Sequence, residues 1–359
     1  MYYFGCWDDP KAALREYLEI KESLQAGIDP RKLSSNGVTT TVGELVNLWL
    51  DQKNANLTAK DISPRSFQDY QDVGKIVVNA FGRHTPVRGL KPENFANLRN
   101  DVASRYAPSR MSKIVTVVRM IFKWGSESDA LPSPMKFGPN FKGASKKQAR
   151  ETRNATVKRF FTASDINTLV DSARQPIKAM ILLGINCGLG NTDVANIRDE
   201  HIQNGWLMMA RAKTAIERRI PLWPETLAAI EEAKKTRKKE NSPSGEGLLF
   251  LTRNGGLWTE FGNDELAKQF SKLLKASELY VARRTFYALR HTFQTVGDEE
   301  KDPVATSAIM GHADNSMAST YREHIGDDRL KAVVNHVRKW LLSRGVKPTD
   351  DTACFVGVG

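Results

Sequence analysis

Residues 287–293 read Tyr-Ala-Leu-Arg-His-Thr-Phe and lie in a predicted helix over about 286–299. Two short stretches follow: Ile309-Met310-Gly311-His312 closes a second predicted helix, and Thr320-Tyr321-Arg322-Glu323 lies on a third. Upstream, Lys213 occupies a turn between two predicted strands, Gly205–Arg211 and Ile216–Leu222. The last third of the chain therefore presents a Lys, an Arg, a His and a Tyr in a fixed order.

In this order and spacing, these residues closely resemble the tyrosine recombinase family of phage-type integrases. Arg290 and His312 lie 22 positions apart, and His312 and Tyr321 nine, both usual for the family. The resemblance implies that Tyr321 attacks the scissile phosphate of DNA, forms a 3′-phosphotyrosyl intermediate and releases a 5′-hydroxyl. It also implies that Arg290 grips the nonbridging oxygens and that His312 donates a hydrogen bond to the phosphate. Lys213 would protonate the leaving oxygen.

Tyr287 lies three positions before Arg290, where the family often has His and sometimes Lys or Tyr. It would supply a hydroxyl donor but no imidazole acid or base. The resemblance implies phosphoryl transfer with no metal and no cofactor. Taken singly, each site residue also fits a structural role: an exposed turn lysine for Lys213, a carboxylate partner for Arg290, a helix cap for His312 and a core aromatic for Tyr321.

The sequence departs from the family at its first catalytic Arg. The run Cys187-Gly188-Leu189-Gly190-Asn191-Thr192-Asp193 follows a predicted buried helix, and Gly190 stands at the Arg position, three before Asp193. Losing a preorganised phosphate ligand typically costs about 2.7–4 kcal/mol, roughly 10²–10³ in rate. Two interpretations stay open: a recombinase relic or DNA-binding derivative with little cleavage, or an enzyme in which another cation takes the place of the missing one.

We favour the second interpretation, with Arg211 as the substitute. Arg211 lies two residues before Lys213 and is expected to face the same side of its strand. Arg198, Arg218 and Arg219 are further cations near this part of the chain.

The predicted fold class is mainly α with a small antiparallel sheet. It joins a helical, SAM-like core-binding domain to an α+β catalytic domain with the DNA breaking-rejoining enzyme fold. The family layout implies five segments: 1–36, a partial arm-binding-like strand (2–7) and helix (10–27); 38–137, the core-binding domain; 138–159, a basic linker; 160–345, the catalytic domain; and 346–359, a tail.

Helix-start signals predict the elements of both domains. The first domain should hold four helices, which start near Thr41, Ser63, Lys91 and Ser109. The second should hold a buried helix over Ile177–Gly188 and a short strand at Leu248–Leu251. Two further helices should start at Thr162 and Pro224. The remaining predicted helices span 264–276, 286–299, 303–310, 316–322 and 328–343. The last helix either docks on a neighbouring protomer or packs on its own domain.

The charge balance makes a polyanion the first candidate partner. The chain has 53 Lys and Arg against 41 Asp and Glu, a net charge of +12. Segment 138–159 alone holds seven Lys and Arg and one Glu, so it is either an extended strap along a phosphate backbone or a solvated linker. The candidate DNA-binding residues are Arg110, Lys113, Lys142, Lys146, Lys147, Arg150 and Arg153.

Composition disfavours other classes. The apolar runs are far shorter than the roughly 20 residues that span a bilayer, and residues 1–30 lack the pattern of a signal peptide. The three cysteines, at 6, 187 and 354, suit neither a disulfide framework nor a zinc site. We therefore expect a protein of the bacterial cytoplasm or nucleoid, with no membrane partner.

The resulting prediction is a site-specific DNA recombinase, the integrase of a mobile element, that acts on duplex DNA attachment sites. It should be a monomer or weak oligomer when free and a homotetramer on synapsed DNA, with an accessory directionality factor. The alternatives are a noncatalytic DNA-binding or regulatory protein on the same fold, and a type IB topoisomerase, which the short chain and helical domain fit less well.

Overall fold

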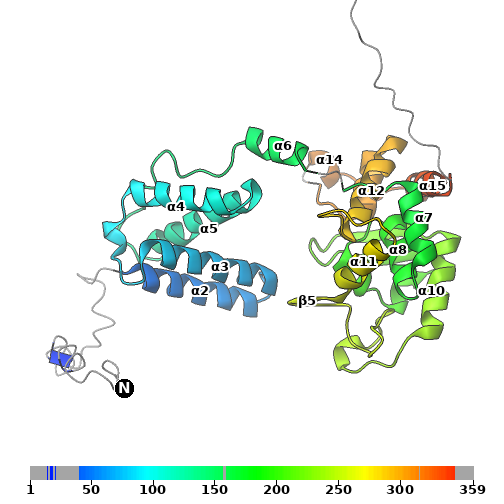
Figure 1. Cartoon of the computed structure of the whole chain (residues 1–359), viewed down its shortest axis with the longest axis horizontal. Coiled ribbons are helices and arrows are strands. Elements are labelled where there is room, and N and C mark those ends of the chain that lie inside the picture. The colour runs from blue at the N-terminus through cyan, green and yellow to red at the C-terminus, as the bar shows by residue number, and fades with distance from the viewer. Residues whose placement is uncertain are drawn as a thin grey trace, which may run out of the picture. The chain divides into compact units, whose positions relative to one another are not determined.

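The computed structural model describes residues 40–156, 159–314 and 316–343, together with Leu14, Tyr17, Leu18 and Lys21; the side chain of Thr320 is also outside the description. The chain divides into two compact units, Met1–Thr156 and Val157–Gly359 (Figure 1). The predicted strand at 2–7, most of the predicted helix at 10–27 and the tail at 346–359 lie outside the described residues. No described helix is long and apolar enough to cross a membrane.

The first unit is built on four helices, as the capping signals predict: α2 (Val42–Thr58), α3 (Pro64–Phe81), α4 (Pro92–Arg105) and α5 (Pro108–Glu127). Thr41 and Glu44 form a capping box at the start of α2, and Ser63 caps α3. A short 3₁₀ turn, η2 (Val87–Gly89), precedes α4. The buried faces of these helices meet in one apolar core, with Trp49, Phe95 and Phe122 among its largest side chains.

The prediction of an extended segment over 138–159 is wrong, because Lys146–Asn154 form helix α6. Ser145 and Gln148 make a capping box that starts this helix, although its high charge and the preceding Gly and Ser residues suggested a loop. Phe141, also assigned to the linker, is buried in the core of the first unit, where it packs against Phe95 and Phe137.

The second unit is mostly helical. Its helices are α7 (Ala163–Ser172), α8 (Ile177–Asn186), α9 (Asn191–Ala195), α10 (Pro224–Thr236), α11 (Glu265–Ala276), α12 (Tyr287–Gly297), α13 (Pro303–Met310), α14 (Met317–Thr320) and α15 (Asp327–Leu342). The described part of this unit also has 3₁₀ turns η3 (Asp199–His201), η4 (Pro243–Gly245) and η5 (Asp298–Glu300).

A three-stranded antiparallel sheet lies in this unit, in the order β1 (Ile202–Gln203), β2 (Trp206–Ala210), β3 (Glu217–Pro221). The predicted hairpin is confirmed, with Leu207 opposite Ile220. The strand predicted at Leu248–Leu251 is wrong: Leu248 makes only an isolated bridge to Arg198. A small hairpin, β4 (Thr259–Glu260) with β5 (Asn263–Asp264), was not predicted.

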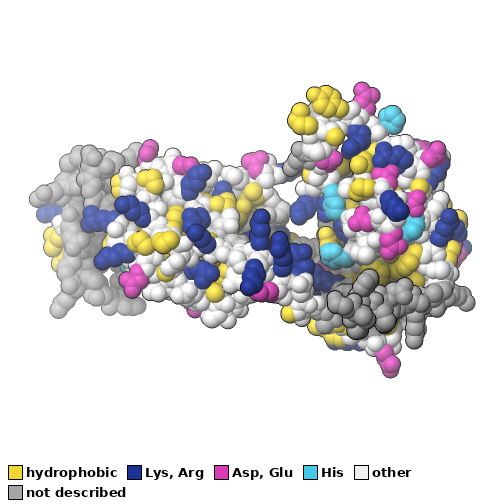
Figure 2. Space-filling model, turned by 90° about the horizontal axis from the view of Figure 1, so that it is seen from above, with side chains coloured by type: hydrophobic (Ala, Val, Ile, Leu, Met, Phe, Trp, Pro, Cys, Tyr) yellow, Lys and Arg dark blue, Asp and Glu magenta, His cyan; other side chains and the backbone are white. Residues whose placement is uncertain are grey.

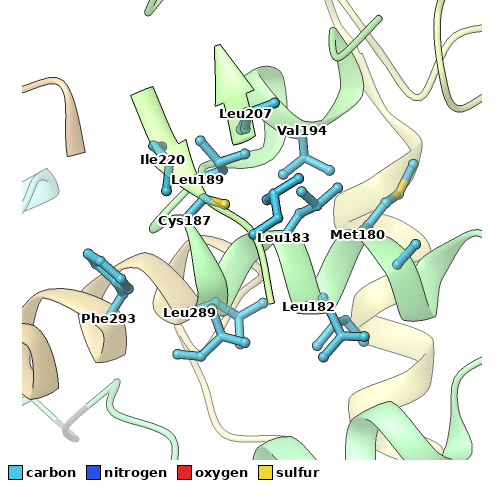
Figure 3. Close-up of a cluster of buried hydrophobic side chains, with 14 of the residues drawn as sticks. Met180, Leu182, Leu183, Cys187, Leu189, Val194, Leu207, Ile220, Leu289 and Phe293 are labelled. Atoms are coloured by element: carbon cyan, nitrogen blue, oxygen red, sulfur yellow. The ribbon is translucent and has the colours of Figure 1, made fainter. Parts of the chain in front are cut away.

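The core of the second unit surrounds α8, which is buried almost along its whole length (Figure 3). Its side chains meet Leu207 and Ile220 of the hairpin and Leu289 and Phe293 of α12. The last helix, α15, packs on its own unit through Val333, Val334, Val337 and Leu341. The core around α8 thus anchors both the hairpin and α12, which carry most of the predicted site residues.

Candidate phosphoryl-transfer site

Arg290 joins three parts of the second unit. Its residue is only 2% exposed, and its two terminal nitrogens donate to the carbonyl oxygens of Gly188 and Met310, each at 2.6 Å. Burial, followed by the positive charge of Arg211, lowers the pKa of Arg290 to about 10. The guanidinium therefore stays charged at neutral pH, and α12, the loop before α9 and the end of α13 are held around it.

His312 follows a glycine that must adopt a left-handed conformation. Gly311 has φ +61°, and the amides of Gly311 and His312 donate to the carbonyls of Ala308 and Ser307, both at 3.0 Å. Burial, then the charge of Arg290 and then that of Arg211, lower the pKa of His312 below its ordinary value of 6.5. The imidazole is therefore neutral at pH 7, with one nitrogen to donate and one to accept.

The turn of the β2–β3 hairpin is tied to the His312 segment. Arg211 donates through Nη1 to the carbonyl of Gly311 at 3.0 Å, and the Thr214 hydroxyl donates to the same oxygen at 3.2 Å. Lys213 lies between these two residues with an exposed side chain. The turn that carries Lys213 therefore lies next to the segment of His312. Arg290 is bonded to Met310, which belongs to the same segment.

Gly190 is the N-cap of α9, and an aromatic ring lies where its side chain would begin. A Cβ at this position would meet the Cδ2 and Cε2 atoms of Tyr287, both at 3.1 Å. The φ of Gly190 is −92°, which any residue adopts, so space and not backbone conformation is what limits the side chain here. Tyr287 is 42% exposed and also meets His291 edge-on, with ring centroids 5.3 Å apart.

Tyr321 directly follows α14 and is 79% exposed, so it is not a core aromatic. The segment around it is held by Arg322, which pairs with Asp314 at 3.4 Å. A phenol placed this way is open to a large substrate.

The remaining arginines named from the sequence differ in their partners and in their burial. Arg219 pairs with Asp327 and lies over the Trp206 ring, and Arg198 donates to the carbonyl of Glu246, so neither joins the Arg290 cluster. Arg218 is different: it is buried and pairs with Asp193 at 3.0 Å. Strand alternation is the signal for this, because Arg218 shares a strand face with the core residue Ile220.

The candidate DNA-binding residues fall into two groups. Four are exposed along α6, where Lys147 pairs loosely with Glu151 at 3.8 Å: Lys146, Lys147, Arg150 and Arg153. Lys142 precedes them, and its carbonyl accepts from Arg99. Arg110 and Lys113 of α5 instead pair with Asp69, whose pKa they hold below its ordinary value, against an opposing effect of burial. Figure 2 shows Lys and Arg side chains gathered on one face of the first unit.

No group of three or more His, Cys, Asp or Glu side chains within 40–156, 159–314 and 316–343 could hold a metal ion.

Comparison with solved structures supports the fold. A lambda integrase dimer bound to a COC′ core site matches with a TM-score of 0.58 and 15% identity, over 78% of this chain and 98% of that one. A lambda integrase tetramer bound to a Holliday junction matches at 0.58 and 17%, over 90% and 91% of the two chains. The integrase of transposon Tn1549, in complex with a circular intermediate DNA, matches at 0.58 and 15%, over 83% and 99%.

These likenesses identify the second unit as a tyrosine recombinase catalytic fold, as the sequence predicted. No curated protein matches the chain in sequence. The sequence model of the phage integrase family matches residues 155–326, which include Gly190, the hairpin, Arg290, His312 and Tyr321. Residues 155–326 therefore form a domain that matches the phage integrase family.

Proposed function

We propose that this protein is a site-specific DNA recombinase that cuts and rejoins duplex DNA through a phosphotyrosyl intermediate, in the integration or excision of a mobile element. The observation that carries the proposal is the convergence of Arg290, His312 and the Lys213 turn around the Gly311 segment. These residues come from three separate stretches of sequence, and each supplies a group that phosphoryl transfer needs.

In the proposed reaction, the Tyr321 oxygen bonds to the scissile phosphorus while the bond to the 5′ oxygen breaks. Lys213 gives the leaving oxygen its proton, and the phenol proton passes to water. Arg290 and His312 stabilise the charge that develops on the nonbridging oxygens. Tyr287 adds one hydroxyl donor at the edge of the site. The exposed ring of Tyr321 and exposed side chain of Lys213 suit a duplex substrate.

DNA binding would rest mainly on α6, because its four basic side chains are exposed on one short helix. Synapsis would use four protomers, by analogy with the lambda integrase tetramer on a Holliday junction, and an accessory factor would set its direction. Arg110 and Lys113 would contribute less charge because Asp69 already balances part of it.

The second candidate function is a DNA-binding protein on the same fold that cleaves poorly. Gly190 favours it, since the position offers no guanidinium. The two functions differ in whether the wild-type chain makes a covalent bond to DNA.

A nicked suicide duplex that carries the attachment site, taken from the ends of the encoding element, tests both. Wild type should give a protein–DNA adduct on denaturing gels that Tyr321→Phe abolishes. An adduct that survives Tyr321→Phe would refute the nucleophile assignment. If wild type gives no adduct and Gly190→Arg with Tyr287→His does, the native chain is the DNA-binding derivative; the second substitution makes room for the arginine.

A further inference from the structure

Arg218 is a buried arginine with donors left over. Its side chain has no solvent exposure, and Nη1 donates to the Oδ2 of Asp193 at 3.0 Å. Its Nε and Nη2 are also buried and have no hydrogen-bond partner. Buried N–H groups of a charged side chain are costly to leave unpaired, so a guanidinium in this condition calls for a further partner, such as water or an anion.

The side chain of Arg218 lies between the segment of His312 and the start of α9. The Cδ of Arg218 lies 2.9 Å from the point that a Cβ on Gly311 would occupy, beside His312. Its guanidinium reaches Asp193, which lies within the first turn after Gly190. The side chain therefore runs from the His312 segment towards the start of α9, where the family has its first catalytic Arg.

The charges around Arg218 favour an anion. Burial and Arg211 lower the pKa of Arg290 most, and Arg218 lowers it further, while the negative charge of Asp193 acts the other way. Arg290 thus lies close to two further guanidinium groups and to one carboxylate, that of Asp193. A bound phosphate would balance the excess of positive charge.

Arg211 is the weaker substitute. One of its terminal nitrogens already donates to the carbonyl of Gly311, and its residue is only half-buried. It can hold the His312 segment without meeting a substrate. Arg218 has two unused donors and does not hold the Gly311 carbonyl.

We propose that Arg218 is the second guanidinium of the phosphate site and that its Nη2 donates to a nonbridging oxygen of the scissile phosphate, in place of the arginine absent at Gly190. This inference rests on the proposed recombinase function. Asp193 then acts as the positioning residue that orients the Arg218 guanidinium through Nη1.

The test compares cleavage of two suicide duplexes, one with the normal scissile phosphodiester and one with an uncharged methylphosphonate there. Arg218→Met should cut the rate of adduct formation about 10²–10³-fold on the phosphodiester. It should have a much smaller effect on the methylphosphonate, because a methyl group there replaces one of the two charged nonbridging oxygens and the transition state carries one negative charge fewer. An equal loss on both substrates would mean a structural role and would overturn the proposal. Arg211→Met in the same assay must not show the substrate-dependent loss.

Two further variants guard against misfolding. The double variant Arg218→Met with Asp193→Asn removes both members of the ion pair and leaves no unpaired carboxylate. Arg219→Met is the matched control, because this neighbour pairs with Asp327 outside the cluster. It should behave as wild type on both substrates.

A binding measurement does not depend on cleavage. Orthovanadate, an analogue of the pentacoordinate phosphate, should raise the melting temperature of wild type and of Arg219→Met, at matched ionic strength. The double variant should lose this increase. An unchanged increase in the double variant, or none in wild type, would overturn the inference. An adduct missing from wild type on the phosphodiester would instead count against the proposed function.

Discussion

The aromatic ring of Tyr287 lies 3.1 Å from the place that a Cβ on Gly190 would take. The ring therefore fills space into which the family's first catalytic arginine would extend. Gly190, the departure from the family pattern, thus lies against Tyr287, which occupies a position where the family often has His and sometimes Lys or Tyr. We interpret the two residues as one coupled change in packing, so that substituting either one alone should fail to restore the family arrangement.

Gly190→Arg should lower the free energy of unfolding by about 1–3 kcal/mol, because the new Cβ would lie 3.1 Å from the Tyr287 ring and force it to shift. Adding Tyr287→His should recover most of this loss. A double-mutant cycle from urea unfolding gives the coupling free energy between the two positions. Additive effects of the two substitutions would show that the contact carries no energetic weight.

Asn186 is a second residue whose loss should be costly. It is fully buried at the end of α8, where its Oδ1 accepts from the Trp223 amide at 2.8 Å and its Nδ2 donates to the Pro221 carbonyl at 3.1 Å. Asn186→Leu should destabilise the second unit by about 1–3 kcal/mol, because the Trp223 N–H and Pro221 C=O are left buried without partners. Urea unfolding followed by tryptophan fluorescence measures this. Asn196→Leu, at an exposed site, is the control and should change stability little.

Stability should also fall on mild acidification. Burial is the main cause that holds the pKa values of His201, His291 and His312 below 6.5. The unfolded chain therefore takes up protons at a higher pH than the folded chain. The free energy of unfolding should decline as pH drops through about 6.5, towards the lower pKa values of the folded state.

Unfolding curves between about pH 7.5 and 5.5 test this in a range where the carboxylates of both states stay ionised. His312→Gln should flatten the dependence, since it removes one of the three groups. Stability that stays constant over this range in wild type would contradict the expectation.

The basic face of α6 should account for much of the salt dependence of DNA binding. Each side chain that neutralises a phosphate should add about 0.9 to the steepness of log K against log salt. Replacing Lys146, Arg150 and Arg153 with Ala should therefore make the dependence shallower for a duplex of arbitrary sequence. Replacing Arg110 and Lys113 with Gln should change it less, because Asp69 already pairs with both. A larger effect from the second set would place the DNA on α5 instead.

Much of the fold could be read from local signals. Ser63-Pro64 and Thr41 with Glu44 mark helix starts that the structure confirms, because they satisfy backbone amides within four residues of sequence. The hairpin was equally accessible, since its turn is local. The two-residue period of a strand, which places Arg218 on the same face of β3 as Ile220, carried the information that Arg218 faces the core.

Other elements had no local signal strong enough. Helix α9 has five residues, too few for a helical period to show. Strand β1 has two, and it exists only because β2 pairs with it. In α6 the capping box of Ser145 and Gln148 was hidden by charge that suggested a solvated loop. The contact between Gly190 and Tyr287 joins residues far apart in the chain, so only the packing of α12 beside α9 reveals it.

The ion pair between Asp193 and Arg218 also changes how relatives of this chain can be found in genomes. A search pattern that demands an arginine at the Gly190 position rejects this sequence outright. A pattern that asks for Gly190, Asp193 and, 25 residues after the aspartate, an arginine on the return strand would retrieve it. Such a pattern would separate a lineage that has moved a positive charge from the start of a helix to a strand from scattered genes that have simply lost one.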